Sequence, residues 1–207
     1  MAQGLYIRQM LLSDLDNFTY ILADKVSGAA CVIDPAAACA VVMDVLQKEK
    51  FSLQMVLLTH GHYDHVVDVD KFDVPVHLSA AEADLYLPAA RQLVRTPDGA
   101  KIRLGPFVVE CLHTPGHTPG CQCFLVDGNL FTGDTLFMGA VGRTDFPGGD
   151  ARQLFHSLQR LKSMPATTRV WPGHNYGSGR SGTIAEMKRH NPYFACEDSG
   201  QFVSYFS

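Results

Sequence analysis

Thr59-His60-Gly61-His62-Tyr63-Asp64-His65 is the stretch of this 207-residue chain that decides its fold and its chemistry. Three imidazoles and one carboxylate lie within six residues, so they can converge only where the backbone turns tightly, as it does at the end of a strand. The apolar segment Met55–Leu58 comes directly before this motif and is typical of a strand buried on both faces. We therefore predict that the motif lies at the carboxyl end of a buried strand.

Three later segments carry a further histidine or carboxylate just after an apolar strand. His117 lies in the glycine-rich sequence TPGHTPG, Asp134 lies in FTGDT, and His174 lies in WPGHNY. Loops that follow strands are a common place for the site residues of sheet-based enzymes. We therefore expect all four segments to meet at one site.

The combined side chains offer imidazole nitrogen together with carboxylate oxygen, a mixture that borderline metals such as Zn²⁺ accept. No cysteine thiolate belongs to the set, which favours a catalytic site over a closed structural one. A single histidine is more often a surface or core residue than a ligand, and four histidines are assigned to that class: His77, His113, His156 and His190. Of these, His113 is placed to orient the loop that carries His117.

Composition and charge exclude several classes of protein. A hydrophobic share of 46% and a charged share of 18% are typical of a folded globular protein. The net charge of −4 gives no attractive field for polyanions, so we expect no nucleic-acid partner. Without a signal-peptide core or a run of roughly eighteen apolar residues, we expect no membrane partner and a cytoplasmic location. The six cysteines lack disulfide spacing and are interpreted as apolar interior residues rather than a thiol site.

Strand-like and helix-like segments alternate without a repeat or a linker, so we predict one α/β domain over residues 1–207. Strands are predicted at Leu5–Leu12, Phe18–Ala23, Ala29–Ile33, Met55–Leu58, Val74–Leu78, Phe107–Leu112, Gln122–Val126, Leu130–Thr132 and Arg169–Trp171. Helices are predicted at Ala36–Lys50, Ala80–Leu87, Ala151–Leu161 and Thr183–His190. Loops are predicted at Pro88–Pro97 and Gly139–Gly149, with hairpin turns at Asp98-Gly99 and Asp127-Gly128.

In order, spacing and local context these motifs resemble the metallo-β-lactamase superfamily, from near the start of the chain to about Pro192. The resemblance implies an α/β fold in four layers, an αβ/βα sandwich of two mixed β-sheets flanked by helices, with the metals at one edge between the sheets. It implies two divalent metal ions, with zinc preferred and iron or manganese as alternatives. The implied ligands are His60, His62 and His117 for the first metal, Asp64, His65 and His174 for the second, and Asp134 bridging both. Asp64 and Asp134 are the predicted catalytic carboxylates.

Three features narrow the branch of the superfamily. The β-lactamases proper usually carry cysteine where Asp134 stands, and the diiron oxygen-reducing branch usually carries glutamate where His62 stands, so both are disfavoured. The sequence GDTLFMGAVGRTDFPGGD, from Gly133 to Asp150, resembles the glyoxalase II group (hydroxyacylglutathione hydrolases) and the related persulfide dioxygenases.

The first hypothesis is a dinuclear metallohydrolase that uses a metal-bridging hydroxide to hydrolyse a small thioester such as a hydroxyacylglutathione. Two metals lower the pKa of a bound water enough to supply a nucleophile near neutral pH, and a thiolate leaves readily. The alternative is a mononuclear Fe(II) persulfide dioxygenase acting on glutathione persulfide, with His60, His117 and Asp134 as its two-histidine, one-carboxylate face. The third hypothesis is a nucleic-acid-processing or non-catalytic binding protein. The net negative charge of the chain and the complete set of metal ligands disfavour it.

Arg143 and Tyr176 are the predicted substrate-binding residues. A guanidinium at Arg143 can clamp a carboxylate by two parallel hydrogen bonds, or it can organise its own loop by pairing with Asp145 or Asp150. In glyoxalase II the positions that match Arg143 and Tyr176 contact glutathione. The expected partner is therefore a small-molecule thioester or another thiol-derived substrate.

The end of the chain departs from the glyoxalase II pattern. Only Asn175–Ser207 follows His174, where glyoxalase II has a helical region with further glutathione contacts, so affinity for glutathione does not follow from the resemblance. The apolar tail from Phe202 to Phe206 is expected to pack on the body of the protein or on a second copy in a homodimer.

Overall fold

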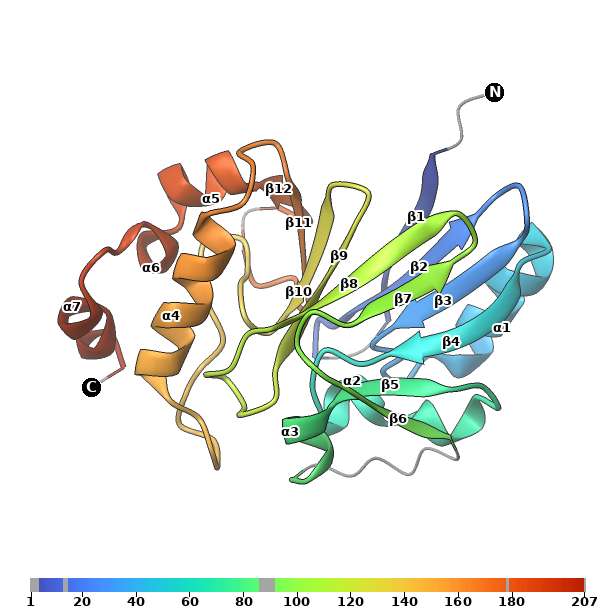
Figure 1. Cartoon of the computed structure of the whole chain (residues 1–207), viewed down its shortest axis with the longest axis horizontal. Coiled ribbons are helices and arrows are strands. Elements are labelled where there is room, and N and C mark those ends of the chain that lie inside the picture. Colours follow the sequence, from blue (N-terminus) through green and yellow to red (C-terminus); the bar gives the residue numbers. More distant parts are fainter. Residues whose placement is uncertain (1–3, 13–14, 86–91, 178, 207) are drawn as a thin grey trace.

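Two mixed β-sheets form the centre of the computed structural model, which describes residues 4–12, 15–85, 92–177 and 179–206 (Figure 1). In spatial order, the first sheet contains β1 (Leu5–Leu11), β2 (Phe18–Asp24), β3 (Ala29–Ile33), β4 (Ser52–Leu57), β5 (Val76–Ser79) and β6 (Leu93–Thr96). In the same way the second sheet contains β12 (Gly182–Thr183), β11 (Arg169–Pro172), β10 (Asn129–Gly133), β9 (Gln122–Val126), β8 (Phe107–His113) and β7 (Lys101–Leu104). Strands β3 to β6 run parallel, as do β10 and β11, and the other neighbours are antiparallel.

Helices cover the outer face of each sheet (Figure 1). The first sheet is covered by α1 (Cys39–Glu49), α2 (Tyr63–Val66), a 3-10 turn at Val69–Lys71, and α3 (Ala80–Ala83). The second sheet is covered by α4 (Ala151–Lys162), α5 (Ile184–His190), α6 (Pro192–Ala195) and α7 (Ser199–Ser204). The order of layers is therefore helix, sheet, sheet, helix, which confirms the predicted αβ/βα sandwich.

Strand β2 shows why both faces of a central strand are apolar. Successive side chains of a strand point to opposite faces of the sheet. Tyr20 and Leu22 pack into the core between the two sheets, where Phe131 of β10 meets them. Ile21 and Ala23 point the other way, into the core beneath α1. Every residue of β2 is buried, because each face of the strand contacts a different apolar layer.

The turn after β3 differs from the prediction. The helix expected from Ala36 begins only at Cys39, because Ala36 adopts a positive φ of 48° that a right-handed helix does not contain. The N–H of Ala36 instead donates to the carbonyl of His65 at 3.1 Å. These residues therefore form a turn that supports the histidine motif.

The region before β7 also differs from the prediction. The predicted loop Pro88–Pro97 contains β6, which pairs in parallel with β5; residues 86–91 lie outside the described part. The predicted helix Ala80–Leu87 is too long: α3 ends at Ala83, Asp84 and Leu85 form a turn, and residues 86 and 87 lie outside the described part. The turn at Asp98-Gly99 was predicted as a hairpin turn, but it joins β6 of the first sheet to β7 of the second. The hairpin lies instead between β7 and β8, at the two residues after Leu104, where Gly105 has a φ of 57°. Neighbouring strands, rather than local signals, determine these elements.

The last segment of the chain packs on the second sheet and its helices. Phe202 of α7 is fully buried, and its ring lies 5.6 Å from that of Phe155 in α4. This contact agrees with the first of the two positions expected for the apolar tail. In the part of the chain that the structure describes, no helix is long and apolar enough to cross a membrane.

Parallel strand pairs bring the site residues together at one edge of the sandwich. Strands β3 and β4 end side by side, so Asp34 and His60 leave the first sheet at the same edge. Strands β10 and β11 do the same for Asp134 and His174 in the second sheet. The carboxyl ends of parallel strands meet at one edge of a sheet, which is why residues distant in sequence face one another here.

Candidate metal centre

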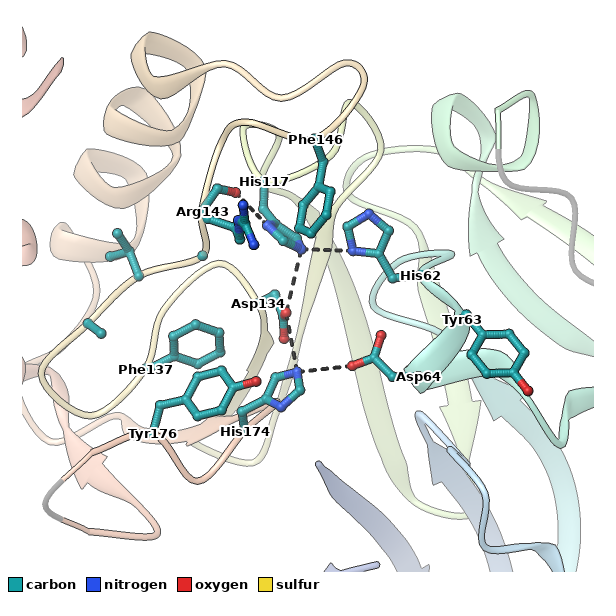
Figure 2. A pocket seen from close by; sticks show the side chains of 13 residues that line it. His62, Tyr63, Asp64, His117, Asp134, Phe137, Arg143, Phe146, His174 and Tyr176 are labelled. Atoms are coloured by element: carbon teal, nitrogen blue, oxygen red, sulfur yellow. Dashed lines mark hydrogen bonds and ion pairs between the residues drawn. The ribbon is translucent and has the colours of Figure 1, made fainter. Parts of the chain in front are cut away.

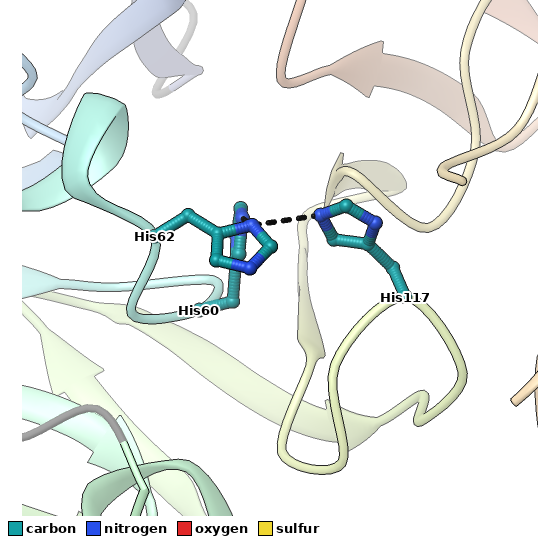
Figure 3. Close-up of side chains that lie close together, drawn as sticks. All are labelled: His60, His62 and His117. Carbon is teal, nitrogen blue, oxygen red and sulfur yellow. Dashed lines mark hydrogen bonds between the residues drawn. The ribbon is translucent and has the colours of Figure 1, made fainter. Parts of the chain in front are cut away.

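His60, His62 and His117 form the first of two ligand groups (Figures 2 and 3). The Nδ1 atom of His62 lies 3.1 Å from Nε2 of His60 and 3.0 Å from Nε2 of His117. Asp134 Oδ2 lies 3.5 Å from His117 Nε2 and 4.0 Å from His60 Nε2. Tetrahedral zinc with bonds of about 2.0–2.1 Å separates its ligands by roughly 3.3 Å, so these spacings suit such an ion.

Asp64, His65 and His174 form the second group. In Figure 2, Asp64 and His174 lie on the other side of Asp134 from His117. His65 Nε2 and His174 Nε2 are 3.2 Å apart, and Asp64 Oδ2 lies 3.5 Å from the first and 3.3 Å from the second. Asp134 again contributes, with Oδ1 3.4 Å from His65 Nε2 and Oδ2 3.4 Å from His174 Nε2. One carboxylate therefore faces both groups, as the predicted bridge requires.

Hydrogen bonds fix the orientation of the imidazoles from outside. The Nδ1 atom of His117 donates to the carbonyl of Arg143 at 2.6 Å, and that of His174 donates to the carbonyl of Leu15 at 2.9 Å. The Nδ1 atom of His65 donates to Asp34 Oδ2 at 3.0 Å. Because these outer partners only accept, each Nδ1 carries hydrogen and each Nε2 is the nitrogen that can bind a metal.

The two groups differ in charge. Burial lowers the pKa of His60 well below its ordinary value, and burial together with His117 lowers that of His62 to about 4. Burial acts in the same direction on His174, but hydrogen bonds to Asp134 and Asp64 outweigh it and raise its pKa to about 9. His60 and His62 are therefore neutral near pH 7, whereas the carboxylates keep positive charge on the second group.

Asp134 gives the clearest indication that the centre accommodates cations. Burial would raise its pKa, yet His65 and His174 lower it well below the usual range, so the carboxylate is ionised. Its Oδ1 atom is buried and accepts no hydrogen bond of good geometry in the described part of the chain, although His65 Nε2 lies 3.4 Å away. A buried carboxylate oxygen without a well-formed hydrogen bond is unfavourable unless a cation contacts it. The residues present therefore fit two divalent ions that share Asp134.

Asp34 follows the end of β3 and supports the segment that follows β4. It was not among the predicted site residues. It accepts hydrogen bonds from the backbone N–H of Thr59 at 2.8 Å, from the Thr59 hydroxyl at 2.6 Å and from His65 Nδ1 at 3.0 Å. Asp34 directly follows a buried strand, the same context that marked Asp134. That signal could have identified it.

Glu82 is the second residue that the prediction missed. It is fully buried and accepts hydrogen bonds from Gly61 N at 2.8 Å, Thr118 Oγ1 at 2.7 Å and Gly120 N at 2.9 Å. It therefore ties the loop of the histidine motif to the loop that carries His117. An acidic residue in a short alanine-rich helix looks solvent-exposed in the sequence, so no local signal indicates this role. Nearby, His113 Nε2 bonds to the carbonyl of Pro119 at 2.9 Å, in agreement with its expected contact with the same loop.

A cavity of about 490 Å³ opens onto the centre, which is a typical size for a small-molecule site. His62, Asp64, His117, Asp134 and His174 lie along its floor in Figure 2. Its other lining residues include four aromatic ones, Tyr63, Phe137, Phe146 and Tyr176. A metal-activated reaction would therefore take place beside a largely aromatic wall.

Both predicted substrate-binding residues line this cavity. Arg143 pairs with Asp145 through its guanidinium, which also lies 4.6 Å from the centre of the Phe146 ring. The ring of Tyr176 stacks on His174 at 4.4 Å with an interplanar angle of 10°. Arg143 thus makes the loop contact given as its alternative role, and binding of substrate by either residue stays a prediction.

Residues 15–174 match the model of the metallo-beta-lactamase superfamily. The chain belongs to this superfamily. It is 36% identical over 194 residues to the probable polyketide biosynthesis zinc-dependent hydrolase BaeB of Bacillus velezensis, covering 91% of this chain and 86% of that protein. It is 34% identical over 206 residues to the mitochondrial persulfide dioxygenase ETHE1 of Homo sapiens, covering 93% and 78%. The crystal structure of TTHA1623 in a di-iron-bound form superimposes with a TM-score of 0.77 and 32% identity, covering 90% and 99%.

These likenesses establish an enzyme of the superfamily with a centre for divalent metals. They agree with the predicted fold and with the predicted branch, since a persulfide dioxygenase is among the relatives. The relatives include a zinc-dependent hydrolase and a protein that binds two irons, so metal identity and reaction differ within this group.

Proposed function

We propose that this superfamily member is a dinuclear metallohydrolase that hydrolyses a small thioester, such as a hydroxyacylglutathione. The observation that carries the proposal is the second ligand group: Asp64, His65 and His174 lie within 3.5 Å of one another and share Asp134 with the first group. In a one-metal enzyme this second set would hold no metal ion, so its presence favours the two-metal hydrolase mildly, since persulfide dioxygenases are expected to retain similar residues. The relative named as a zinc-dependent hydrolase supports the same choice.

The chemistry follows from the arrangement of the site. The two metals, when bound, lower the pKa of a water molecule and stabilise negative charge that develops on the thioester oxygen. Asp134 and Asp64 both have pKa values lowered below the usual range, so they remain ionised near neutral pH and can accept hydrogen bonds from the attacking water. As the water oxygen bonds to the acyl carbon, the carbon–sulfur bond breaks and the thiolate leaves with the electron pair. The attacking water gives one of its two protons to solvent and the other to the departing sulfur, so the products are a carboxylate, a free thiol and one released proton.

The cavity walls support the proposal that a thioester binds here. Phe146 packs edge-on against His62 and His117 with ring centres 4.8 and 5.7 Å away, so one wall beside the first group is apolar. Arg143 lies on the same loop and is the cation placed to meet a substrate carboxylate at the rim. Tyr176 and Phe137 form the opposite wall, beside His174 (Figure 2). An acyl chain between these walls would be shielded from bulk water.

The test measures release of free thiol from a panel of thioesters of glutathione, coenzyme A and pantetheine. The protein is freed of metal and then loaded with zero, one or two equivalents of zinc or of iron. We expect turnover that requires the second equivalent. Absence of turnover on every thioester by the two-metal protein would refute the proposal.

A mononuclear Fe(II) persulfide dioxygenase is the second candidate, and the relationship to human ETHE1 favours it. His117 Nε2 lies 3.5 Å and His60 Nε2 lies 4.0 Å from Asp134 Oδ2, so these residues can form a two-histidine, one-carboxylate face. Oxygen uptake with glutathione persulfide by protein that holds one equivalent of iron, together with no thiol release from thioesters, would select this function.

A further inference from the structure

Asn17 touches every member of the second ligand group. Its amide nitrogen lies 2.9 Å from Asp64 Oδ2, 3.4 Å from His65 Nε2 and 3.4 Å from His174 Nε2. The residue is 1% exposed and precedes β2, more than forty positions before the histidine motif in the sequence. It therefore reaches the centre through the fold and not through the motif.

The backbone holds Asn17 in this place. Phe18 N donates to the carbonyl of Gly173 at 2.7 Å, and Asn175 N donates to the carbonyl of Asp16 at 2.9 Å. These bonds surround an isolated antiparallel bridge between Asn17 and His174. The two backbones are thus tied whatever side chain stands at position 17, so a substitution there leaves the attachment of His174 intact.

The contact with Asp64 is the one with the largest consequence. The oxygen that accepts from Asn17 is Oδ2, the same atom that lies 3.3 Å from His174 Nε2 and 3.5 Å from His65 Nε2. The side chain of Asp64 is 23% exposed, whereas those of His65 and His174 are 0% and 3% exposed. Burial and the hydrogen bonds from their Nδ1 atoms to Asp34 and Leu15 hold the two imidazoles, whereas the more exposed carboxylate of Asp64 has more freedom to rotate. A hydrogen bond from a buried amide removes that freedom.

We propose that Asn17 is the positioning residue of the second metal site. Its amide aims Asp64 Oδ2 between His65 and His174, and this sets how tightly the second metal ion binds. The inference rests on the proposed two-metal function, because it concerns the same site. It adds a residue from outside the metal motifs that controls how fully the centre is loaded.

The experiment measures zinc binding by isothermal titration of metal-free protein, with elemental analysis of the loaded protein as a second readout. Asn17→Leu keeps the size of the side chain and removes the donor. We expect the second zinc to bind about 10- to 100-fold more weakly, the usual range for the loss of a partner that orients a metal ligand, and the first zinc to bind as before. Asn17→Thr keeps a hydroxyl donor and should recover part of the loss.

Asn191→Ala is the matched control. Asn191 is also 1% exposed, but its amide donates to the carbonyls of Phe137 and Ala140, which are not metal ligands. It should bind both zinc ions as the wild type does. The proposal is overturned if Asn17→Leu binds both ions normally, or if Asn17→Leu and Asn17→Thr weaken both ions to the same extent.

The outcomes separate this inference from the proposed function. A wild-type chain that binds two zinc ions but hydrolyses no thioester refutes the function, and the variants still decide the role of Asn17. A wild-type chain that binds only one zinc ion at saturating concentration refutes both.

Discussion

The two ligand groups on either side of Asp134 face the same space with different chemistry. The first group contains only imidazoles, and two of them, His60 and His62, are neutral near pH 7, because their pKa values are lowered, that of His62 to about 4. The second group includes Asp64, and His174 has a pKa of about 9, so it holds a proton that a metal must displace. The centre therefore combines a first half in which His60 and His62 are neutral with a charged second half. A metal ion binds to the second half only when it displaces the proton of His174, so its affinity there depends on pH.

Each half also has a support of its own. Glu82 joins the loops of the first half through Gly61 and Thr118, and Asn17 contacts the ligands of the second. Asp34 serves both halves, because it bonds to His65 and also to Thr59, which contacts His60. Damage to the support of one half alone can therefore leave the other half in place. Each prediction below tests how independent the two halves are.

Asp134→Ala should have the largest effect, because it removes the one side chain that both halves share. Loss of the bridging carboxylate leaves the buried cations without a counter-charge, and we expect activity to fall by about 10³-fold or more, equivalent to roughly 4 kcal/mol of transition-state stabilisation. Steady-state kinetics and elemental analysis of the purified variant measure both losses. A variant with full turnover would show that Asp134 is not part of the centre.

His174→Ala should damage only the second half. In a two-metal hydrolase we expect thioester turnover to fall on the order of 100-fold, while one equivalent of metal remains bound. His62→Ala is the matched change in the first half and should release the first metal instead. If His174→Ala reduces activity only slightly, the reaction requires only one metal ion. That result would favour the dioxygenase hypothesis.

The pH dependence of metal binding should differ between the halves. The two close imidazoles of the second half share at least one proton below pH 9, since the pKa of His174 is about 9, so binding there must release it. We expect the affinity for the second zinc to rise about tenfold per pH unit from pH 6 towards 9. The first zinc should show a smaller slope in this range, because His60 and His62 are already neutral there. Titration calorimetry at several pH values in buffers of known ionisation heat provides the measurement, and equal slopes for both ions would contradict the comparison.

How much of this could be predicted from the sequence depends on whether a residue carries a local signal. His60, Asp134 and His174 each follow an apolar strand, and that context was enough to place them at one edge of the sheets. Strand β6 and the supports Glu82 and Asn17 carry no such signal. Their roles come from neighbours that are distant in the sequence, and only the folded chain brings those neighbours together.

The helix boundary at Cys39 illustrates the same limit. Composition extends the helical pattern back to Ala36, but the hydrogen bond from Ala36 to His65 holds a turn there instead. The metal motif thus determines the backbone of a segment that precedes it by about thirty residues. A prediction that proceeds along the chain has no access to that constraint.

Arg143→Ala should have the smallest effect on activity of the changes considered. It separates the two contacts of this residue, that of its backbone carbonyl with His117 and that of its guanidinium with a substrate. The carbonyl of Arg143 accepts from His117 Nδ1 at 2.6 Å and stays in the variant, so the first metal should bind normally. Only the guanidinium is lost, and its side chain is 63% exposed. An exposed ion pair contributes at most about 1 kcal/mol, so KM for a carboxylate-bearing thioester should rise roughly fivefold with kcat unchanged.

Two comparisons make that small effect interpretable. Asp145→Asn frees the guanidinium from its present partner and should lower KM for the same substrate, because the substrate carboxylate no longer competes with Asp145. A thioester without a carboxylate should give equal KM values in the wild type and both variants. A similar rise in KM for the neutral thioester would mean that Arg143 acts through the shape of its loop, and the two halves of the centre would then be coupled through His117.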